Sequence, residues 1–277
     1  MKFFKLMKFD LRHGIFREWK KFFFSALLII AICIMFYMQI MRVGQQRELP
    51  LPTFADYLVF LVYIFSPQEP FRIPINWLIL HLFLAYIVGS YPFQDLMTYG
   101  QSVLLRARSR SRWWASKCLW SICCVFVFYL EVIVISFLFS AITGKVSMSL
   151  SVQLLKEIID VSFSQGLSAE TLTLNLIILP LLTSIAISLI QLCFALILKP
   201  IYSYLVVAVL LLSSAYIYSP MLIGNYLMMA RSSMVLQGGI SLIYALPTAI
   251  AIAVAAAFIG NLFFRRYNII DSGRGES

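Results

Sequence analysis

The stretch FFFSALLIIAICIMFYMQIM, residues 22–41, contains no charged side chain and decides the fold. Lys20 and Lys21 precede it, and Arg42 follows it. The hydrocarbon core of a bilayer is about 30 Å thick and needs roughly 20 apolar helical residues to cross it. In lipid, backbone groups must be hydrogen-bonded within their own segment. Residues 22–41 are therefore predicted to form a transmembrane helix.

The composition of the whole chain agrees with this prediction. Its 277 residues are 61% hydrophobic and 12% charged, and the mean hydropathy is +0.90. Soluble domains carry about 25% charged residues, so this composition excludes a water-soluble enzyme, and the low charge excludes a disordered chain. Five further apolar stretches are predicted to span the bilayer: 73–91, 119–139, 172–198, 202–218 and 240–264. The fold class is thus an all-α polytopic membrane protein with six transmembrane helices in one domain, residues 1–277.

The basic residues predict the orientation. If the N-terminus lies in the cytoplasm, 16 of the 22 Lys and Arg residues fall on the cytoplasmic side, most of them in residues 1–21 and in the loop 92–117. Cytoplasmic loops of membrane proteins are enriched in Lys and Arg. Both termini are therefore expected in the cytoplasm.

Two shorter apolar segments are expected to lie outside the spans. Residues 1–21 carry an apolar helical face and a basic face, which is typical of a helix lying in the membrane interface. The apolar face comprises Phe4, Met7, Leu11 and Ile15, and the basic face Lys5, Lys8 and Arg12. The run Tyr57 to Phe65 is too short to span and is predicted to be an external hairpin or an interfacial helix.

The spans carry few polar side chains. His81 and Glu131 are predicted to lie at similar depths in neighbouring spans and to form a pair or a shared hydrogen-bond network, with Gln191 as a further member. A carboxylate in mid-bilayer costs about 2.5–3.5 kcal/mol on insertion scales. Either a satisfied packing pair or a role in gating or substrate contact explains it. Small residues at four-residue steps predict a helix-packing face, within one subunit or between two, formed by Ala245, Ala249, Ala253 and Ala257.

No catalytic residue and no metal site is predicted. The sequence has no GxxxxGK[ST] phosphate loop, no HExxH and no GxSxG motif, and it contains two histidines. We therefore expect no cofactor bound by this chain.

The loop 92–117 is the most informative part of the sequence. It contains RARSRSRWWASK, residues 106–117, in which four arginines alternate with small residues before two tryptophans and a lysine. One interpretation is a cytoplasmic basic loop whose Trp113, Trp114 and Lys117 anchor it at the membrane interface. Another is a lipid-headgroup site over Arg106 to Arg112. Nucleic-acid binding is not expected, because the orientation rule already explains the charge.

The sequence resembles the permease subunits of ABC-2 type exporters of Gram-positive bacteria. The resemblance rests on PTF at 52–54, DY at 56–57, YP at 91–92, DL at 95–96, YGQ at 99–101 and the Arg-rich loop with WW and SK. It implies that residues 1–21 form an elbow helix and that the loop 92–117 carries a coupling helix held by a separate ATPase subunit. By position, the implied coupling residues are Asp95, Tyr99, Gly100, Gln101, Arg106, Arg108 and Arg110.

The same resemblance implies the function. The chain would move a hydrophobic or amphipathic substrate out of the cell, across the bacterial plasma membrane. ATP and Mg would bind the partner ATPase, and a second permease subunit, the same or related, would complete the complex in contact with membrane lipid. Two alternatives remain open: a non-transporting assembly or sensory subunit, and an intramembrane enzyme that uses Glu131 and His81.

Overall fold

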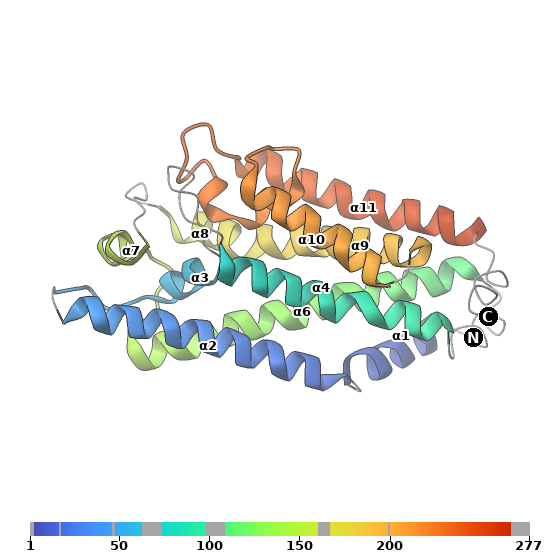
Figure 1. Cartoon of the computed structure of the whole chain (residues 1–277), viewed down its shortest axis with the longest axis horizontal. Helices are drawn as coiled ribbons and strands as arrows, with labels where there is room; N and C mark the ends of the chain where they lie inside the picture. Colours follow the sequence, from blue (N-terminus) through green and yellow to red (C-terminus); the bar gives the residue numbers. More distant parts are fainter. Residues whose placement is uncertain are drawn as a thin grey trace.

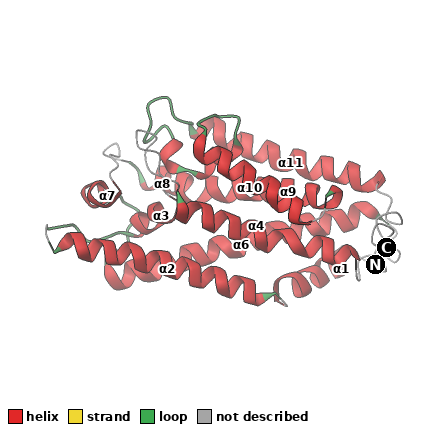
Figure 2. Cartoon of the chain, viewed as in Figure 1, coloured by secondary structure: helices red, strands yellow, loops and turns green. Residues whose placement is uncertain are grey.

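The computed structural model of the chain describes residues 3–16, 18–45, 48–62, 74–97, 109–159, 167–198 and 200–266. These residues form helices joined by loops, and no strand is found among them (Figure 2). The long helices are α2 (Trp19–Gly44), α4 (Ile75–Met97), α6 (Arg110–Thr143), α9 (Leu179–Ile197), α10 (Pro200–Tyr216) and α11 (Leu242–Arg266). The short helices are α1 (Phe3–Leu11), α3 (Phe54–Val62), α7 (Val152–Ile159) and α8 (Ala169–Thr173), with π- or 3-10-helical turns at η1 (Arg12–Phe16), η2 (Leu174–Ile178), η3 (Ile223–Leu227) and η4 (Met229–Arg231).

The long helices lie side by side in an elongated bundle (Figure 1). One end, called the α1 end below, holds α1, the end of α4, the start of α6 and the end of α11; α3, α7 and α8 lie at the opposite end, called the α3 end. Helix α9 packs against α4, α6, α10 and α11, so it forms the centre of the bundle. Its inward face is apolar apart from four small or amide side chains: Thr183, Ser184, Ser188 and Gln191.

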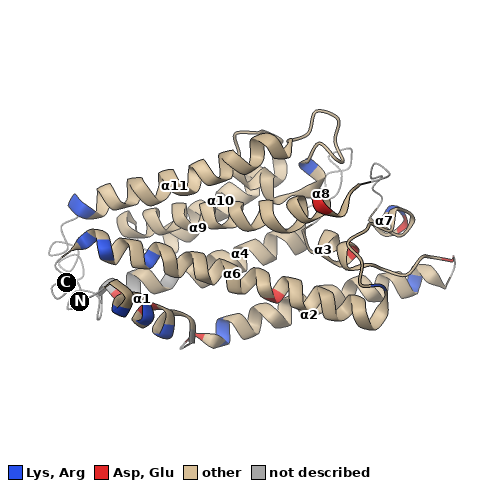
Figure 3. Cartoon of the chain, turned by 180° about the vertical axis from the view of Figure 1, so that it is seen from behind, with Lys and Arg blue, Asp and Glu red and all other residues tan. Residues whose placement is uncertain are grey.

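Four helical segments of the described chain are long and apolar enough to cross a membrane: Trp19–Gly44, Arg110–Thr143, Ala169–Ile197 and Leu242–Arg266. Two further apolar helices, Ile75–Gly89 and Pro200–Tyr216, are shorter. All six predicted spans are thus helical over most of their length. Large apolar side chains cover the outer faces of α2, α6, α10 and α11, for example Leu27, Leu130, Val209 and Phe258. Lys and Arg gather toward the two ends of the bundle, as expected of a membrane-embedded protein (Figure 3).

A wide π-helical turn precedes the central helix. Residues Ala169–Ile197 run as α8, η2 and α9 without a break, and Pro180 occupies the first turn of α9. Proline lacks an N–H group, and its ring clashes with the carbonyl four residues earlier. The π turn η2 lies directly before this proline, where the extra residue per turn changes the hydrogen-bond register. The apolar segment predicted over 172–198 therefore continues through its proline as one helical path.

The N-terminal helix docks on the bundle through a face that includes a buried carboxylate. Helix α1 packs against α6, and its buried positions are Leu6 and Asp10, followed by Gly14 in η1. Of the predicted apolar face, Phe4 is 74% exposed, whereas Leu11 and Ile15 are half-buried and pack against the core. The docked face thus includes a carboxylate, which an interfacial helix resting on lipid alone would not bury.

Helix α3 is packed within the protein rather than at its periphery. Every residue of α3 except Phe54 is buried, and the helix contacts α6 and α2. This corrects the expectation of an external hairpin or interfacial helix over Tyr57 to Phe65, of which residues 63–65 lie outside the described chain. The run is too short to span the bilayer, but it is long enough to fill the gap between the ends of α2 and α6.

A buried carboxylate fixes the start of α3. Asp56 accepts hydrogen bonds from the backbone N–H groups of Thr53 (2.9 Å) and Ser151 (3.0 Å), and the Thr53 hydroxyl in turn accepts from the Asp56 N–H (3.2 Å). This reciprocal arrangement is a capping box. Burial raises the pKa of Asp56, and the hydrogen bonds oppose that rise. Asp56 thereby joins α3 to the segment that follows α6.

Candidate functional site

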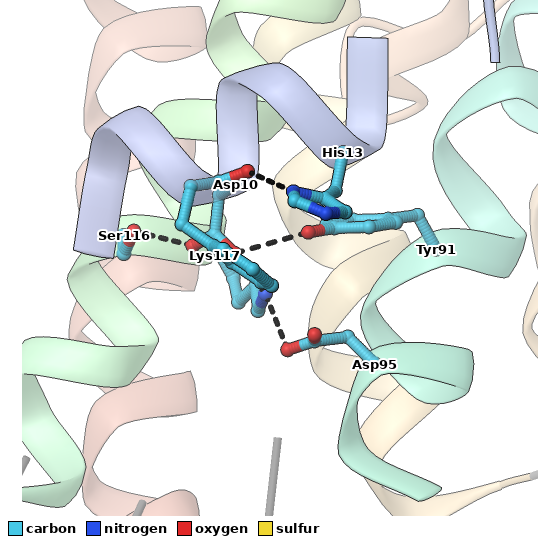
Figure 4. A network of polar contacts seen from close by, with 7 residues as sticks. Asp10, His13, Tyr91, Asp95, Ser116 and Lys117 are labelled. Carbon is cyan, nitrogen blue, oxygen red and sulfur yellow. Dashed lines mark hydrogen bonds and ion pairs between the residues drawn. The ribbon is translucent and has the colours of Figure 1, made fainter. Parts of the chain in front are cut away.

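A buried cluster of charged side chains lies at the α1 end, where three helices meet (Figure 4). Asp10 comes from α1, Asp95 from the last turns of α4 and Lys117 from the first turns of α6. Their exposed fractions are 1%, 7% and 0%. Long charged side chains are almost never fully buried unless they are paired. The cluster is therefore the strongest candidate for a functional site among the described residues.

Lys117 is the centre of this cluster. Its Nζ atom lies 2.6 Å from Asp10 Oδ1 and 2.6 Å from Asp95 Oδ2. The same atom lies 4.6 Å from the centre of the Tyr91 ring and 5.0 Å from that of Trp113. Aromatic faces attract a cation at this range, more strongly when water is excluded. Lys117 thus joins α1 to α4 and α6 through two ion pairs inside a desolvated aromatic cage.

Asp10 receives two further hydrogen bonds. The Tyr91 hydroxyl donates to Oδ1 at 3.0 Å, and the Ser116 hydroxyl donates to Oδ2 at 2.5 Å. Two carboxylates face one ammonium, so the ionised cluster has a net charge of −1 before these hydroxyl donors are counted. Hydrogen bonds to a carboxylate are about twice as strong as neutral ones. The two hydroxyl groups therefore stabilise the excess negative charge without adding a second cation.

A glycine brings the N-terminal helix close enough to form the cluster. A Cβ atom on Gly14 would lie 2.2 Å from Trp120 Nε1 on α6, a distance that real atoms do not adopt. The Trp120 ring also packs against the ring of Tyr91, the residue that donates to Asp10, with the two ring centres 4.6 Å apart. Gly14, Trp120 and Tyr91 therefore set the distance at which Asp10 meets Lys117.

The predicted membrane anchors lie inside the protein. Trp113 and Trp114 are 0% and 2% exposed, and both stack on Phe264 of α11, at 4.6 and 6.4 Å. The Trp114 indole also donates to the backbone oxygen of Ala257 (2.7 Å). The prediction that Trp113, Trp114 and Lys117 face the membrane interface is therefore wrong. Tryptophan and lysine at the edge of a predicted span occur both in helices that contact lipid and in helices that pack against another helix. The sequence alone therefore does not distinguish these two cases.

The structure describes two of the seven predicted coupling residues. Tyr99, Gly100, Gln101, Arg106 and Arg108 lie outside the described residues. Asp95 is buried against Lys117, so its carboxylate is not free to contact a partner subunit, contrary to the prediction. The Arg110 guanidinium donates to the backbone oxygen of Arg265 at the end of α11 (2.8 Å). Both residues thus bind within this chain, on the helices on either side of residues 98–109.

The predicted Glu131–His81 pair does not form. Glu131 accepts a hydrogen bond from Ser25 of α2, whereas the His81 Nδ1 atom lies 2.8 Å from the backbone oxygen of Trp77 in its own helix. Gln191 donates to the backbone oxygen of Ala85 at 2.9 Å and lines the same small cavity as His81. The prediction placed His81 and Glu131 at one depth, but their helices turn the two side chains in different directions.

The small residues of α11 face the rest of this chain. Ala245 and Ala249 are fully buried, Ala253 and Ala257 are half-buried, and α11 packs most extensively against α9. A Cβ atom on Gly260 would lie 2.1 Å from the Trp114 ring. Close helix contact of this kind is typical of small residues in membrane bundles. The stripe is therefore used within one subunit.

One family model matches most of the chain. The model is described as "Protein of unknown function (DUF2705)", and it matches residues 28–270. The chain belongs to the DUF2705 family. No curated protein and no solved structure matches it. The DUF2705 match includes Asp95 and Lys117, whereas Asp10 and the rest of α1 precede it.

Asp10 is not among the site residues predicted from the sequence. Asp10 is the one acidic residue among the first seventeen, which otherwise carry five Lys or Arg residues. It follows Leu6 by four residues and precedes Gly14 by four, so these three share one helical face. An isolated acid on the same face as a glycine, within a basic helix, was the signal that indicated a docking contact.

Proposed function

We propose that this DUF2705 chain is the membrane-spanning permease subunit of an ATP-driven exporter of the ABC-2 type. It has six membrane-crossing helices and moves a hydrophobic or amphipathic substrate outward. A separate ATPase subunit supplies the energy, with ATP and Mg bound there, and a second permease subunit completes the transport path. The complex lies in the bacterial plasma membrane, with both termini of this chain in the cytoplasm.

The observation that carries this proposal is the Asp10–Lys117–Asp95 cluster. Asp95 and Lys117 lie on α4 and α6, the two helices on either side of residues 98–109, and Asp10 ties the N-terminal helix to both. A partner that grips the loop and the N-terminal helix would therefore act on one mechanically connected unit. Breaking this unit would leave a buried charge unpaired, so α1, α4 and α6 are expected to move together at this end.

Two features of the sequence support the same function. The chain has no phosphate-binding loop, so a transporter of this kind requires an external source of energy. A ligand shifts a conformational equilibrium only when it binds the two states differently. An ATPase that closes on the loop only in its ATP-bound form meets this requirement.

The proposal is tested by purifying the tagged full chain from its native membrane in mild detergent. We expect an ATP-binding cassette ATPase to co-purify, and the reconstituted complex to hydrolyse ATP faster than the isolated ATPase. Absence of any such ATPase from the purified complex would contradict the proposal.

A matched pair of variants tests the role of the cluster. Lys117→Met is expected to retain the bound ATPase but to lower the stimulated hydrolysis, because α1 and the loop-bearing helices no longer move together. Lys156→Met, on the exposed face of α7, changes the same side chain far from the cluster and is expected to behave like the wild type. If the two variants stimulated ATP hydrolysis equally, the cluster would have no role in the transport cycle.

A further inference from the structure

A small cavity lies among α4, α9, α10 and η3. His81, Ser184, Ser188 and Gln191 supply its polar lining, and leucine and isoleucine side chains supply most of the rest. The volume of this cavity is about 10 Å³. One water molecule needs about 10–15 Å³ by this measure, together with two to four polar partners. The cavity is therefore matched in size to a single small ligand.

The hydrogen bond to Trp77 fixes the tautomer of His81. The Nδ1 atom lies 2.8 Å from the Trp77 backbone oxygen, and a carbonyl oxygen can only accept, so Nδ1 carries the hydrogen. In a neutral imidazole the other nitrogen, Nε2, is then an acceptor. This Nε2 atom is buried, and no group in the described part of the chain donates to it.

Gln191 presents a second acceptor. Its Nε2 atom donates to the Ala85 backbone oxygen at 2.9 Å, which fixes the orientation of the amide because the reverse orientation would oppose two oxygens. Gly89 makes this contact possible, since a Cβ atom there would lie 2.7 Å from the Gln191 nitrogen. The Gln191 Oε1 atom is buried, and no described residue donates to it.

His81 Nε2 and Gln191 Oε1 are both acceptors and cannot hydrogen-bond to each other. A ligand that satisfies both must therefore carry two donor hydrogens. We propose that the cavity binds one water molecule, which donates to His81 Nε2 and to Gln191 Oε1. The hydroxyl groups of Ser184 and Ser188 line the same space. A cation such as ammonium also has donors, but no carboxylate lines the cavity to offset the cost of burying its charge.

The bound water adds a second polar link between α4 and α9, beside the hydrogen bond from Gln191 to the Ala85 backbone oxygen. The Ser184 hydroxyl lies 2.9 Å from the hydroxyl of Tyr129 on α6. The Ser184 hydroxyl, which lines the cavity, thus also has a hydrogen-bond partner on α6. Because no described residue donates to the two acceptors, His81 Nε2 and Gln191 Oε1, loss of the water would leave both unsatisfied, so the site is expected to stay occupied.

The test is nuclear magnetic resonance of the full chain in nanodiscs with ¹⁵N-labelled histidine. The chain has two histidines, so His13→Asn assigns the His81 signals by difference. We expect a neutral ring with hydrogen on Nδ1, and magnetisation transfer from water to the His81 ring. Hydrogen on Nε2, or a ring with no transfer from water, would overturn the proposal.

A pair of Ser→Val variants tests the position of the water. Ser188→Val places a methyl group in the cavity and is expected to abolish the transfer while leaving the tautomer unchanged. Ser136→Val makes the same change at a buried site on α6 that does not line the cavity, and it is expected to retain the transfer. Transfer that persists in Ser188→Val would overturn the proposal, and if that variant does not fold, the wild-type tautomer and transfer decide the question alone.

Discussion

Replacing Lys117 by methionine removes the only ammonium group of the buried cluster and keeps the length of the side chain. Asp10 and Asp95 then lie beside each other without the cation that each contacts at 2.6 Å. Removing one member of a buried ion pair costs about 3–5 kcal/mol, because the remaining charge is uncompensated. Every 1.4 kcal/mol is a factor of ten. The ratio of docked to undocked α1 is therefore expected to fall by roughly two to four orders of magnitude.

The assay is hydrogen exchange followed by mass spectrometry on the chain in nanodiscs. In Lys117→Met, amide groups of α1 are expected to exchange far faster than in the wild type, while those of α9 at the centre of the bundle change little. Exposed positions rarely shift stability by more than about 0.5 kcal/mol. Lys156→Met, at an exposed lysine of α7, is therefore the matched control.

A triple variant separates charge from packing. Adding Asp10→Asn and Asp95→Asn to Lys117→Met removes all three charges and is expected to restore much of the protection of α1, because no buried charge is left unpaired. The reasoning is refuted if Lys117→Met leaves the exchange of α1 unchanged, or if the triple variant is less protected than the single one.

Three further perturbations test other contacts. Gly14→Ala places a Cβ atom 2.2 Å from Trp120 Nε1 and is expected to speed amide hydrogen exchange in α1. Gly44→Ala is the control, because a Cβ atom there has no neighbour within 4 Å. Equal exchange rates of α1 in the two variants would contradict this prediction. Gly260→Ala introduces an overlap with an indole ring of α6 and is expected to lower the stability by about 1–3 kcal/mol, seen as a fall in the thermal midpoint; an unchanged midpoint would argue against close packing there. Burial raises the pKa of Asp56, so the folded state holds this proton at a higher pH than the unfolded state, where the pKa is about 3.9. Stability is thus expected to fall as the pH rises from that value through the raised pKa. In Asp56→Asn the thermal midpoint should vary less with pH over this range. If the variant and the wild type show the same pH dependence, this prediction is wrong.

The sequence predicted the apolar helices well because their signal is local. Twenty consecutive uncharged and mostly apolar residues, as in 22–41, need no knowledge of the rest of the chain to be recognised as a helix. The same local signal failed for Tyr57 to Phe65. A run of nine apolar residues can lie either on a membrane surface or in a protein interior. Here it is buried because α3 packs against α2 and α6, and this contact cannot be read from the run itself.

The polar contacts were harder to predict because they depend on how each helix is rotated. Rise per residue placed His81 and Glu131 at one depth, but it does not determine which side of a helix faces which neighbour. Glu131 turns toward Ser25, and His81 toward Gln191. Lys117 follows two tryptophans at the edge of a predicted span, which is why the sequence predicts an interfacial anchor. Its carboxylate partners come from segments 22 and 107 residues earlier in the chain. A local sequence pattern cannot predict ion pairs between residues so far apart in the chain.

The most direct test of the proposed function is the location of the loop between α4 and α6. Gln101→Cys, in a chain whose five native cysteines are replaced by serine or alanine, provides a single reactive thiol in that loop. A membrane-impermeant maleimide is expected to label it in inverted vesicles but not in right-side-out cells, and the bound ATPase is expected to block the labelling. Labelling of intact cells from outside would contradict the account.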